Sequence, residues 1–214
     1  MKNRKTVLII AIAIILVSII MYFLPLGTIL GNLPLIKRFY NNTSIEIITE
    51  KGKAQVTIND KDYGQTPTTV ENLPEGKYTI ELKKIADDNT FYQKQIFEVE
   101  LAKNTSARVD LEIGPENILN GTILYYTSVP HTSAGRGLVT ITSSATDAKV
   151  YIDKEYIGNA PISNLELKDN QYQVKVSATG YEDIEIPVFV RASYQLNLKT
   201  YHFPIPVNFD TVSD

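Results

Sequence analysis

The chain has 214 residues, no cysteine, no tryptophan and a formal net charge of −3. The lack of cysteine excludes disulfides, thiol chemistry, Cys-based metal sites and a lipoprotein anchor, which requires an acylated cysteine. Without Lys2, Arg4 and Lys5, the rest of the chain carries 18 basic and 24 acidic side chains, a formal charge of −6. Such a surface repels phosphate backbones, so we expect no nucleic-acid partner.

The first predicted element is the apolar run 7–26, VLIIAIAIILVSIIMYFLPL, which contains no charged residue. About 20 apolar residues match the hydrocarbon thickness of a bilayer, so this run is predicted to be a transmembrane helix. The three basic residues precede it, and positive charge favours the cytoplasmic side. We therefore predict a cytoplasmic tip (1–6), a single-pass anchor helix (7–26) and a juxtamembrane segment (27–43).

A cleaved signal peptide is the alternative interpretation of the same run. The apolar region of a signal peptide is usually about 7–15 residues long and is followed by a small-x-small cleavage site. Here the run is longer, and its exit, FLPLG at 23–27, offers no such site. Retention of the anchor is therefore favoured, and both interpretations export the rest of the chain.

Two regions of the remaining chain repeat each other at a fixed offset of 94 residues. The segment 54–67 (AQVTINDKDYGQTP) aligns with 148–161 (AKVYIDKEYIGNAP), and the same register reaches Tyr78 and Tyr172 without a gap. Apolar and turn positions both recur, which chance rarely produces. We conclude that the two regions are copies of one unit.

Each copy is predicted to consist of β-strands, because apolar and polar side chains alternate in 56–58 and again in 150–152. No stretch after the anchor shows a convincing helical period. Strands separated by polar turns at this spacing indicate a small sandwich or barrel. The further strands that we predict are 77–82, 92–101 and 106–113 in the first copy, and 171–176, 181–190 and 194–199 in the second.

The predicted fold is all-β: two tandem small antiparallel β-sandwich domains preceded by a single transmembrane helix. The first domain covers 44–113 and the second covers 138–200. The intervening segment, 114–137, combines a strand at 118–126 with a flexible linker rich in Gly, Pro and Ser. The last segment, 201–214, is aromatic and Pro-spaced, and we expect an extended C-terminal tail.

The recurring turn and packing positions are predicted to build scaffold, because Gly permits unusual dihedrals and Pro ends strand pairing. They are Gly64, Pro67, Leu73, Pro74, Glu75, Gly76 and Tyr78 in the first copy, and Gly158, Pro161, Leu167 and Tyr172 in the second.

The first-copy motif LPEGKY at 73–78 resembles the turn that gives the PEGA domain family its name, with Lys77 in place of the final alanine. The hairpins at 54–67 and 148–161 are similar to the first hairpin of that family. The second copy departs at 167–170, LKDN, where we expect Asn170 to adopt the left-handed conformation that Gly76 supplies. The resemblance implies small β-sandwich modules of envelope proteins, often behind a membrane anchor, and it brings no catalytic residues.

The sequence predicts no catalytic, cofactor-binding or metal-binding residue. Its two histidines, His131 and His202, have no neighbouring ligands at the spacing of a metal site. No nucleophile elbow, phosphate loop or H-E-x-x-H motif occurs in the sequence. Among the 13 tyrosines, Tyr125 and Tyr126 lie outside the repeats and are the best candidates for contact with a sugar, although packing is the favoured interpretation.

These observations predict a non-enzymatic bacterial membrane protein with a cytoplasmic N-terminus and extracytoplasmic β-domains. Its expected role is structural or interactive: it presents two β-modules in the cell envelope for contact with a surface protein or a cell-wall glycan. The alternative is a carbohydrate-binding accessory module that assists an envelope enzyme. We assign no cofactor and no oligomeric state.

Overall fold

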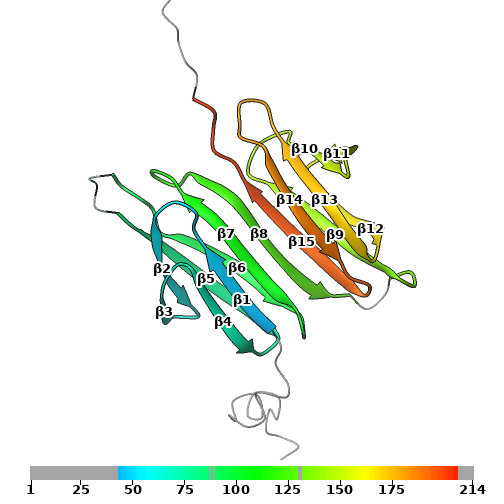
Figure 1. Ribbon diagram of the computed structural model, residues 1–214, viewed down its shortest axis with the longest axis horizontal. Helices are drawn as coiled ribbons and strands as arrows, with labels where there is room; N and C mark the ends of the chain where they lie inside the picture. The colour runs from blue at the N-terminus through cyan, green and yellow to red at the C-terminus, as the bar shows by residue number, and fades with distance from the viewer. Residues whose placement is uncertain (1–42, 87, 89, 130–131, 207–214) are drawn as a thin grey trace, which may run out of the picture.

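The computed structural model describes residues 43–206 except 87, 89, 130 and 131. All regular structure in this part consists of β-strands, 15 in number (Figure 1), which confirms the predicted all-β class. The predicted anchor helix at 7–26 and His131 lie outside the described residues. Within the described part, no helix has the length and apolar character that a membrane crossing requires.

The two copies contain the same strands in the same order. In the first copy they are β1 (Thr43–Ile48), β2 (Lys53–Ile58), β3 (Lys61–Gln65), β4 (Thr68–Leu73), β5 (Gly76–Ile85), β6 (Gln95–Leu101) and β7 (Ser106–Ile113). In the second copy they are β9 (Arg136–Ser143), β10 (Lys149–Ile152), β11 (Glu155–Asn159), β12 (Ile162–Lys168), β13 (Asn170–Ser177), β14 (Ile184–Val190) and β15 (Tyr194–Tyr201).

Each copy is a sandwich of a three-stranded layer and a four-stranded sheet. The layers are β4-β1-β7 and β3-β2-β5-β6 in the first copy, and β12-β9-β15 and β11-β10-β13-β14 in the second. One pair in each copy, β1–β7 or β9–β15, is parallel, so the prediction of purely antiparallel sheets is wrong in this detail. The first and last strands of a copy can be parallel because the whole other sheet serves as the crossover between them.

The strand β8 (Leu119–Ser128) lies in the segment between the copies, where a strand is predicted at 118–126. It is antiparallel to β7 on one side and to β15 on the other. The two three-stranded layers therefore merge into one seven-stranded sheet, in the order β12-β9-β15-β8-β7-β1-β4. The centre of the molecule is thus a strand that belongs to neither repeat.

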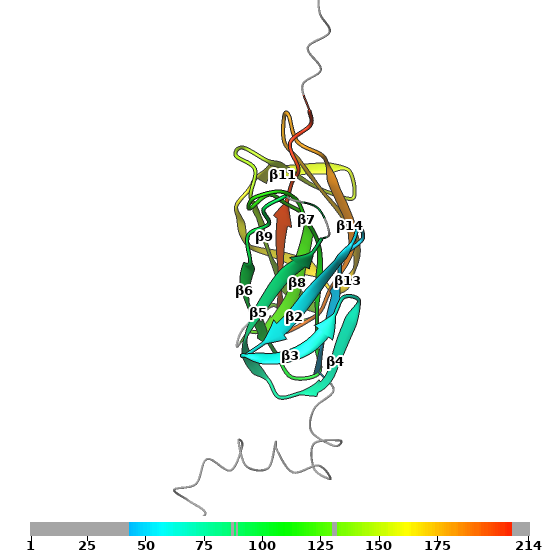
Figure 2. The same cartoon turned by 90° about the vertical axis from the view of Figure 1, so that its left-hand side faces the viewer.

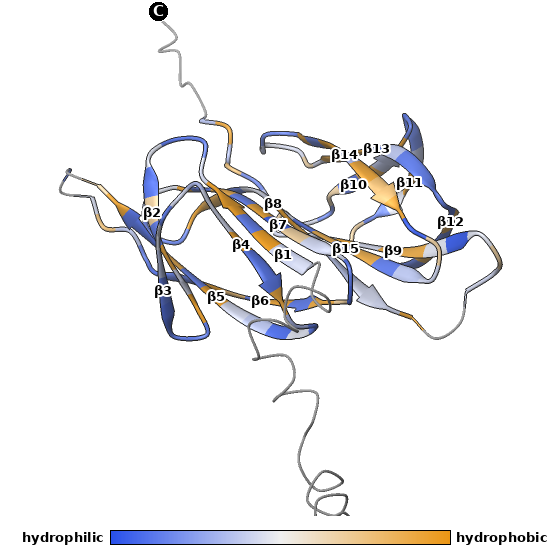
Figure 3. Cartoon of the chain, turned by 60° about the horizontal axis from the view of Figure 1, so that its bottom comes forward, coloured by the Kyte–Doolittle hydropathy of each residue, from blue (hydrophilic) through white to orange (hydrophobic). Residues whose placement is uncertain are grey.

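The four-stranded sheets lie on opposite faces of this shared sheet, as Figure 3 shows. Side chains alternate along β8: Ile123 and Tyr125 pack on the core of the first copy, and Leu124 and Tyr126 pack on that of the second. The strands β7 and β15 run in the same direction on either side of β8, so the copies are related by a half-turn about an axis along β8. Figure 2 shows the first copy end-on.

The cores follow the repeat observed in the sequence. Ile45 and Ile47 of β1 are fully buried, as are Val139 and Ile141 at the matching positions of β9. The predicted strands at 92–101 and 181–190 begin later in the structure, at Gln95 and Ile184. Tyr92 and Tyr181 form only isolated bridges, to Glu116 and Pro204.

Candidate functional site

The first hairpin of each copy has the same two-residue turn. Asn59 and Asp60 have φ angles of 47° and 62°, and Asp153 and Lys154 have φ angles of 49° and 72°. Two successive positive φ angles are typical of a type I′ turn, whose twist matches that of the strands. The Oδ1 atom of Asn59 accepts a hydrogen bond of 2.8 Å from the Thr79 amide, and Oδ1 of Asp153 accepts one of 2.8 Å from the Gln173 amide.

The predicted Gly-x-x-Pro positions lie where the chain passes from one sheet to the other. Gly64 has a φ of 82° near a bulge between β2 and β3, and Gly158 occupies the matching position in β11. Pro67 and Pro161 each follow a cis peptide bond. Just before these prolines, the amides of residues 66 and 160 donate to the carbonyls of residues 54 and 148, at 2.9 Å and 2.8 Å. In both copies, these residues turn the chain from the four-stranded sheet toward the shared sheet.

The 73–78 turn is closed by a tyrosine. Leu73 is buried, Pro74 and Glu75 are exposed, and Gly76 has a φ of 143° at the start of β5. The buried Tyr78 donates its hydroxyl hydrogen to the Pro74 carbonyl at 2.8 Å. A tyrosine that bonds back to the backbone a few residues upstream is a known corner device of β-sandwiches.

The second copy keeps this tyrosine bond although its turn residues differ. Tyr172 donates to the Lys168 carbonyl at 3.2 Å, and Leu167 is half-buried against the second core. The expectation that Asn170 adopts a left-handed conformation is wrong, because Asn170 has no positive φ. It is the first residue of β13 and pairs with Val190 of β14. The corner is made by Asp169, whose amide donates to the Gly135 carbonyl and whose carboxylate accepts from the Ala192 amide, each at 3.0 Å.

Tyr78 gives the fold a pH dependence that can be tested. Burial, aided by the nearby Tyr63, raises the pKa of Tyr78 from 10.0 to about 12. Since the folded-state pKa lies above the unfolded one, this stabilising contribution is complete below pH 10 and is lost as the pH rises toward 12. We expect Tyr78→Phe to cost about 1 kcal/mol at neutral pH through the lost hydrogen bond. The variant should also lose less stability than the natural chain between pH 10 and 12, by an amount on the order of 2 kcal/mol.

Urea denaturation of the full chain, followed by circular dichroism at pH 8, 10 and 12, measures this difference. The comparison from pH 8 to pH 10 is the internal control, because the Tyr78 hydroxyl stays protonated in both states through most of that range. Parallel losses of stability in the two proteins above pH 10 would contradict the assignment.

Tyr125 and Tyr126 point to opposite faces of β8, so the structure does not bring them together. Tyr126 is only 6% exposed, and its hydroxyl donates to the Phe189 carbonyl at 2.6 Å. Tyr125 is half-buried against the first core, with the Lys199 ammonium 5.6 Å from its ring centroid. Burial raises the pKa of both hydroxyls. Packing accounts for these rings, and Tyr126 has no open face for a sugar.

His202 is a packed side chain. Its ring is buried, with Nδ1 2.8 Å from the Glu182 carbonyl and Nε2 2.9 Å from the Thr200 hydroxyl. The His202 amide also donates to the Ser144 hydroxyl at 3.2 Å. Throughout 43–206, apart from the four positions named above, no group of three or more His, Asp or Glu side chains could hold a metal ion.

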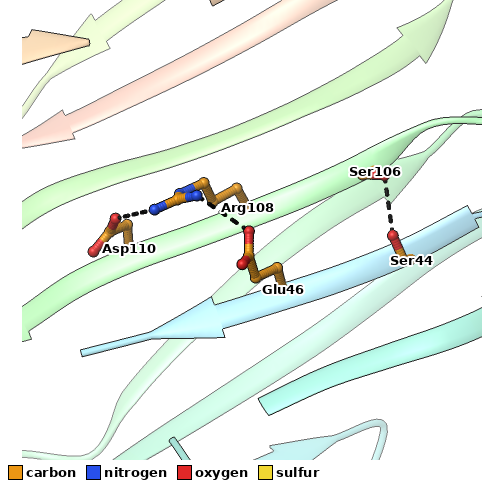
Figure 4. A network of polar contacts seen from close by, with 5 residues as sticks. All are labelled: Ser44, Glu46, Ser106, Arg108 and Asp110. Atoms are coloured by element: carbon orange, nitrogen blue, oxygen red, sulfur yellow. Dashed lines mark hydrogen bonds and ion pairs between the residues drawn. The ribbon is translucent and has the colours of Figure 1, made fainter. Parts of the chain in front are cut away.

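A polar network covers the face of β1 and β7 that points away from the first core (Figure 4). Arg108 contacts the carboxylate of Glu46 at 3.2 Å and that of Asp110 at 2.9 Å. Beside it, the hydroxyls of Ser44 and Ser106 are 3.0 Å apart. The hydrogen bond to Asp110 is the main cause that raises the pKa of Arg108. Exposed pairs of this kind contribute little stability, usually below about 1 kcal/mol.

This polar face borders a cleft between the two copies. The cleft has a volume of about 570 Å³; Arg108 and Asp110 of β7 and Leu124 of β8 line one side, and Ile186 and Phe189 of β14 line the other. Its lining carries five carboxylates and one guanidinium; Arg108 pairs with Asp110 inside the cleft, while Glu112 and Asp183 pair with lysines outside its lining. The cleft is a consequence of placing the two four-stranded sheets on opposite faces.

Comparison with known proteins agrees with the repeat. The profile of the PEGA domain family matches residues 42–117 and 136–201. Among solved structures, the chain is similar to the Bacillus anthracis TIE protein, with 14% sequence identity, a TM-score of 0.25, and coverage of 78% of this chain and 34% of that one. This chain therefore spans about a third of the length of the TIE chain. No curated protein matches it.

Proposed function

Since this chain belongs to the PEGA domain family and carries two copies of the domain, we propose that it is a structural or interaction protein of the bacterial cell envelope. In this proposal, an N-terminal anchor holds the chain in the cell membrane, and both β-modules lie outside the cytoplasm. The modules contact a surface protein or a cell-wall glycan, and the chain has no enzymatic activity.

The continuous seven-stranded sheet is the observation that supports this function best. Because β8 is paired with β7 on one side and β15 on the other, the copies cannot swing apart without breaking one of these pairings. Two modules that share one sheet keep a fixed relative position, which suits a spacer or a two-sided docking platform. The strongly recurring residues serve turns and cores, so function is left to the faces and loops that differ between the copies.

The membrane placement is supported by the sequence before the first module. The run 7–26 is long enough to span a bilayer and is preceded by Lys2, Arg4 and Lys5. The first strand begins at Thr43, so a short segment of chain would connect the membrane to the first module.

Fractionation of cells that express the full chain tests this placement. We expect the chain to stay in the membrane pellet after alkaline extraction, and protease added to intact cells to remove the β-modules. A variant with Ile14→Lys and Ile15→Lys, which places two charges at the centre of the run, should lose membrane retention because each charge costs about 3 kcal/mol there. Protease cleavage that requires prior lysis of the cells would contradict the proposal.

A further inference from the structure

Two tyrosines lie together on the outer face of the second copy. Tyr151 of β10 and Tyr156 of β11 are cross-strand partners, and their ring centroids are 5.6 Å apart with an interplanar angle of 57°. Tyr156 is 53% exposed, the largest exposed fraction among the large hydrophobic side chains of residues 136–206. Its hydroxyl donates to Oδ1 of Asn159 at 2.8 Å, which holds the ring in place.

The tyrosines begin a row of side chains across the sheet. Tyr151 pairs with Lys175 of β13, and Lys175 pairs with Glu185 of β14. Directly opposed residues in a sheet share a face, so this row lies on the side away from the core, into which Val150 and Val174 point. The row combines an aromatic end with a hydrogen-bonding end.

A hollow lies over this row. Its volume is about 600 Å³, and its lining includes Tyr151, Asp153, Lys154, Gln173, Lys175 and Glu185. This size is typical of small-ligand sites. The two ammonium groups in the lining are balanced by two carboxylates, and Lys175 is further paired with Asp183 at 2.8 Å. A balanced lining favours an uncharged ligand over a phosphate, a nucleic acid or a basic peptide.

The first copy shows that the fold does not need these tyrosines. At the matching positions, 94 residues earlier, Thr57 replaces Tyr151, Asp62 replaces Tyr156 and Glu81 replaces Lys175. These residues are paired across the same strands, β2, β3 and β5. The same scaffold therefore forms without an aromatic pair, so packing requirements do not explain the pair in the second copy.

We propose that this outer face of β10, β11 and β13 is a binding site for an uncharged glycan chain. The tyrosine rings stack on the apolar faces of pyranose units, and the Gln, Lys and carboxylate groups beside them bond to the sugar hydroxyls. The site deepens the proposed function, on which it rests for access to cell-wall glycan, and it takes the role that the sequence suggested for Tyr125 and Tyr126.

Titration calorimetry of the purified full chain, kept in a detergent without a sugar head group, tests the site with chitohexaose and cellohexaose as probes. We expect saturable binding of at least one probe. The double variant Tyr151→Ala/Tyr156→Ala should bind about tenfold or more weakly, since each lost ring contact contributes a factor of several. The double variant Tyr151→Phe/Tyr156→Phe retains the rings and should keep most of the affinity.

The matched control is Thr57→Ala/Asp62→Ala, which alters the equivalent positions of the first copy and should leave binding unchanged. Absence of binding for both probes, or equal affinity of the Tyr→Ala variant and the natural chain, would overturn the site. Capture of an envelope protein through the tyrosines without glycan binding would overturn it as well. These results do not depend on where the chain resides, so they are distinct from a failure of the fractionation experiment.

Discussion

Replacing Ile47 with alanine is expected to destabilise both β-modules, although Ile47 lies in the first one. The side chain is fully buried in β1, and truncation of a buried isoleucine to alanine typically costs about 2–5 kcal/mol. Ile141 occupies the matching position in β9 and is also fully buried, so Ile141→Ala should have an effect of similar size. We expect either change to shift one common unfolding transition.

The coupling follows from the position of β8. This strand contributes Ile123 and Tyr125 to the first core and Leu124 and Tyr126 to the second. Unfolding of either copy would leave one face of β8 and one of its edges without a partner. Because the remaining copy would then expose apolar side chains and unpaired backbone groups, a half-folded state is unfavourable.

Hydrogen exchange of the full chain, resolved along the sequence by mass spectrometry, measures the effect in each copy separately. In Ile47→Ala, protection should fall in 136–201 as well as in 43–113. The control is Glu46→Ala in the same strand, which removes an exposed ion pair and should cost less than about 1 kcal/mol. A loss of protection confined to the altered copy would show that the modules fold independently.

Much of the architecture could be predicted from the sequence because the chain contains two copies of one unit, which can be aligned with each other. The offset of 94 residues placed buried and turn positions of one copy over those of the other. The strands β4 and β12 were not predicted, since both are edge strands whose side chains are mostly exposed or half-buried and carry no clear alternation. The pairing of β8 with both copies could not be predicted either, because strand order depends on contacts between distant segments.

The residues of the proposed binding site were harder to predict, because the same repeat directed the prediction to the wrong tyrosines. The sequence points to Tyr125 and Tyr126 because they lie outside the repeats, yet their segment is the central strand and is packed on both faces. Tyr151 and Tyr156 lie inside a repeat, whose recurring positions indicate a structural role. The signal that could have identified them is their difference from Thr57 and Asp62, since a position that changes chemistry between two copies of one fold is not fixed by the fold.

Gly121 is the residue of β8 at which substitution is expected to be most damaging. Its φ is 122°, a conformation that side chains rarely allow, and a Cβ atom there would overlap the backbone carbonyl oxygen of Asp110 in β7. Backbone strain and overlap with another strand each cost on the order of 1–3 kcal/mol, so Gly121→Ala should destabilise the chain by about 3 kcal/mol or more. The overlap lies between β7 and β8, where the first copy joins the shared sheet.

Gly180→Ala separates the two contributions. Gly180 also has a positive φ, 82°, but a Cβ atom there would have no neighbour within 4 Å, so only the backbone strain of about 1–2 kcal/mol remains. Urea denaturation of the two full-length variants measures the difference. If β8 holds the copies together, Gly121→Ala should also divide the single transition in two, with the first copy unfolding at lower urea. Equal destabilisation by the two substitutions would mean that β7 and β8 are not packed as closely as the structure shows.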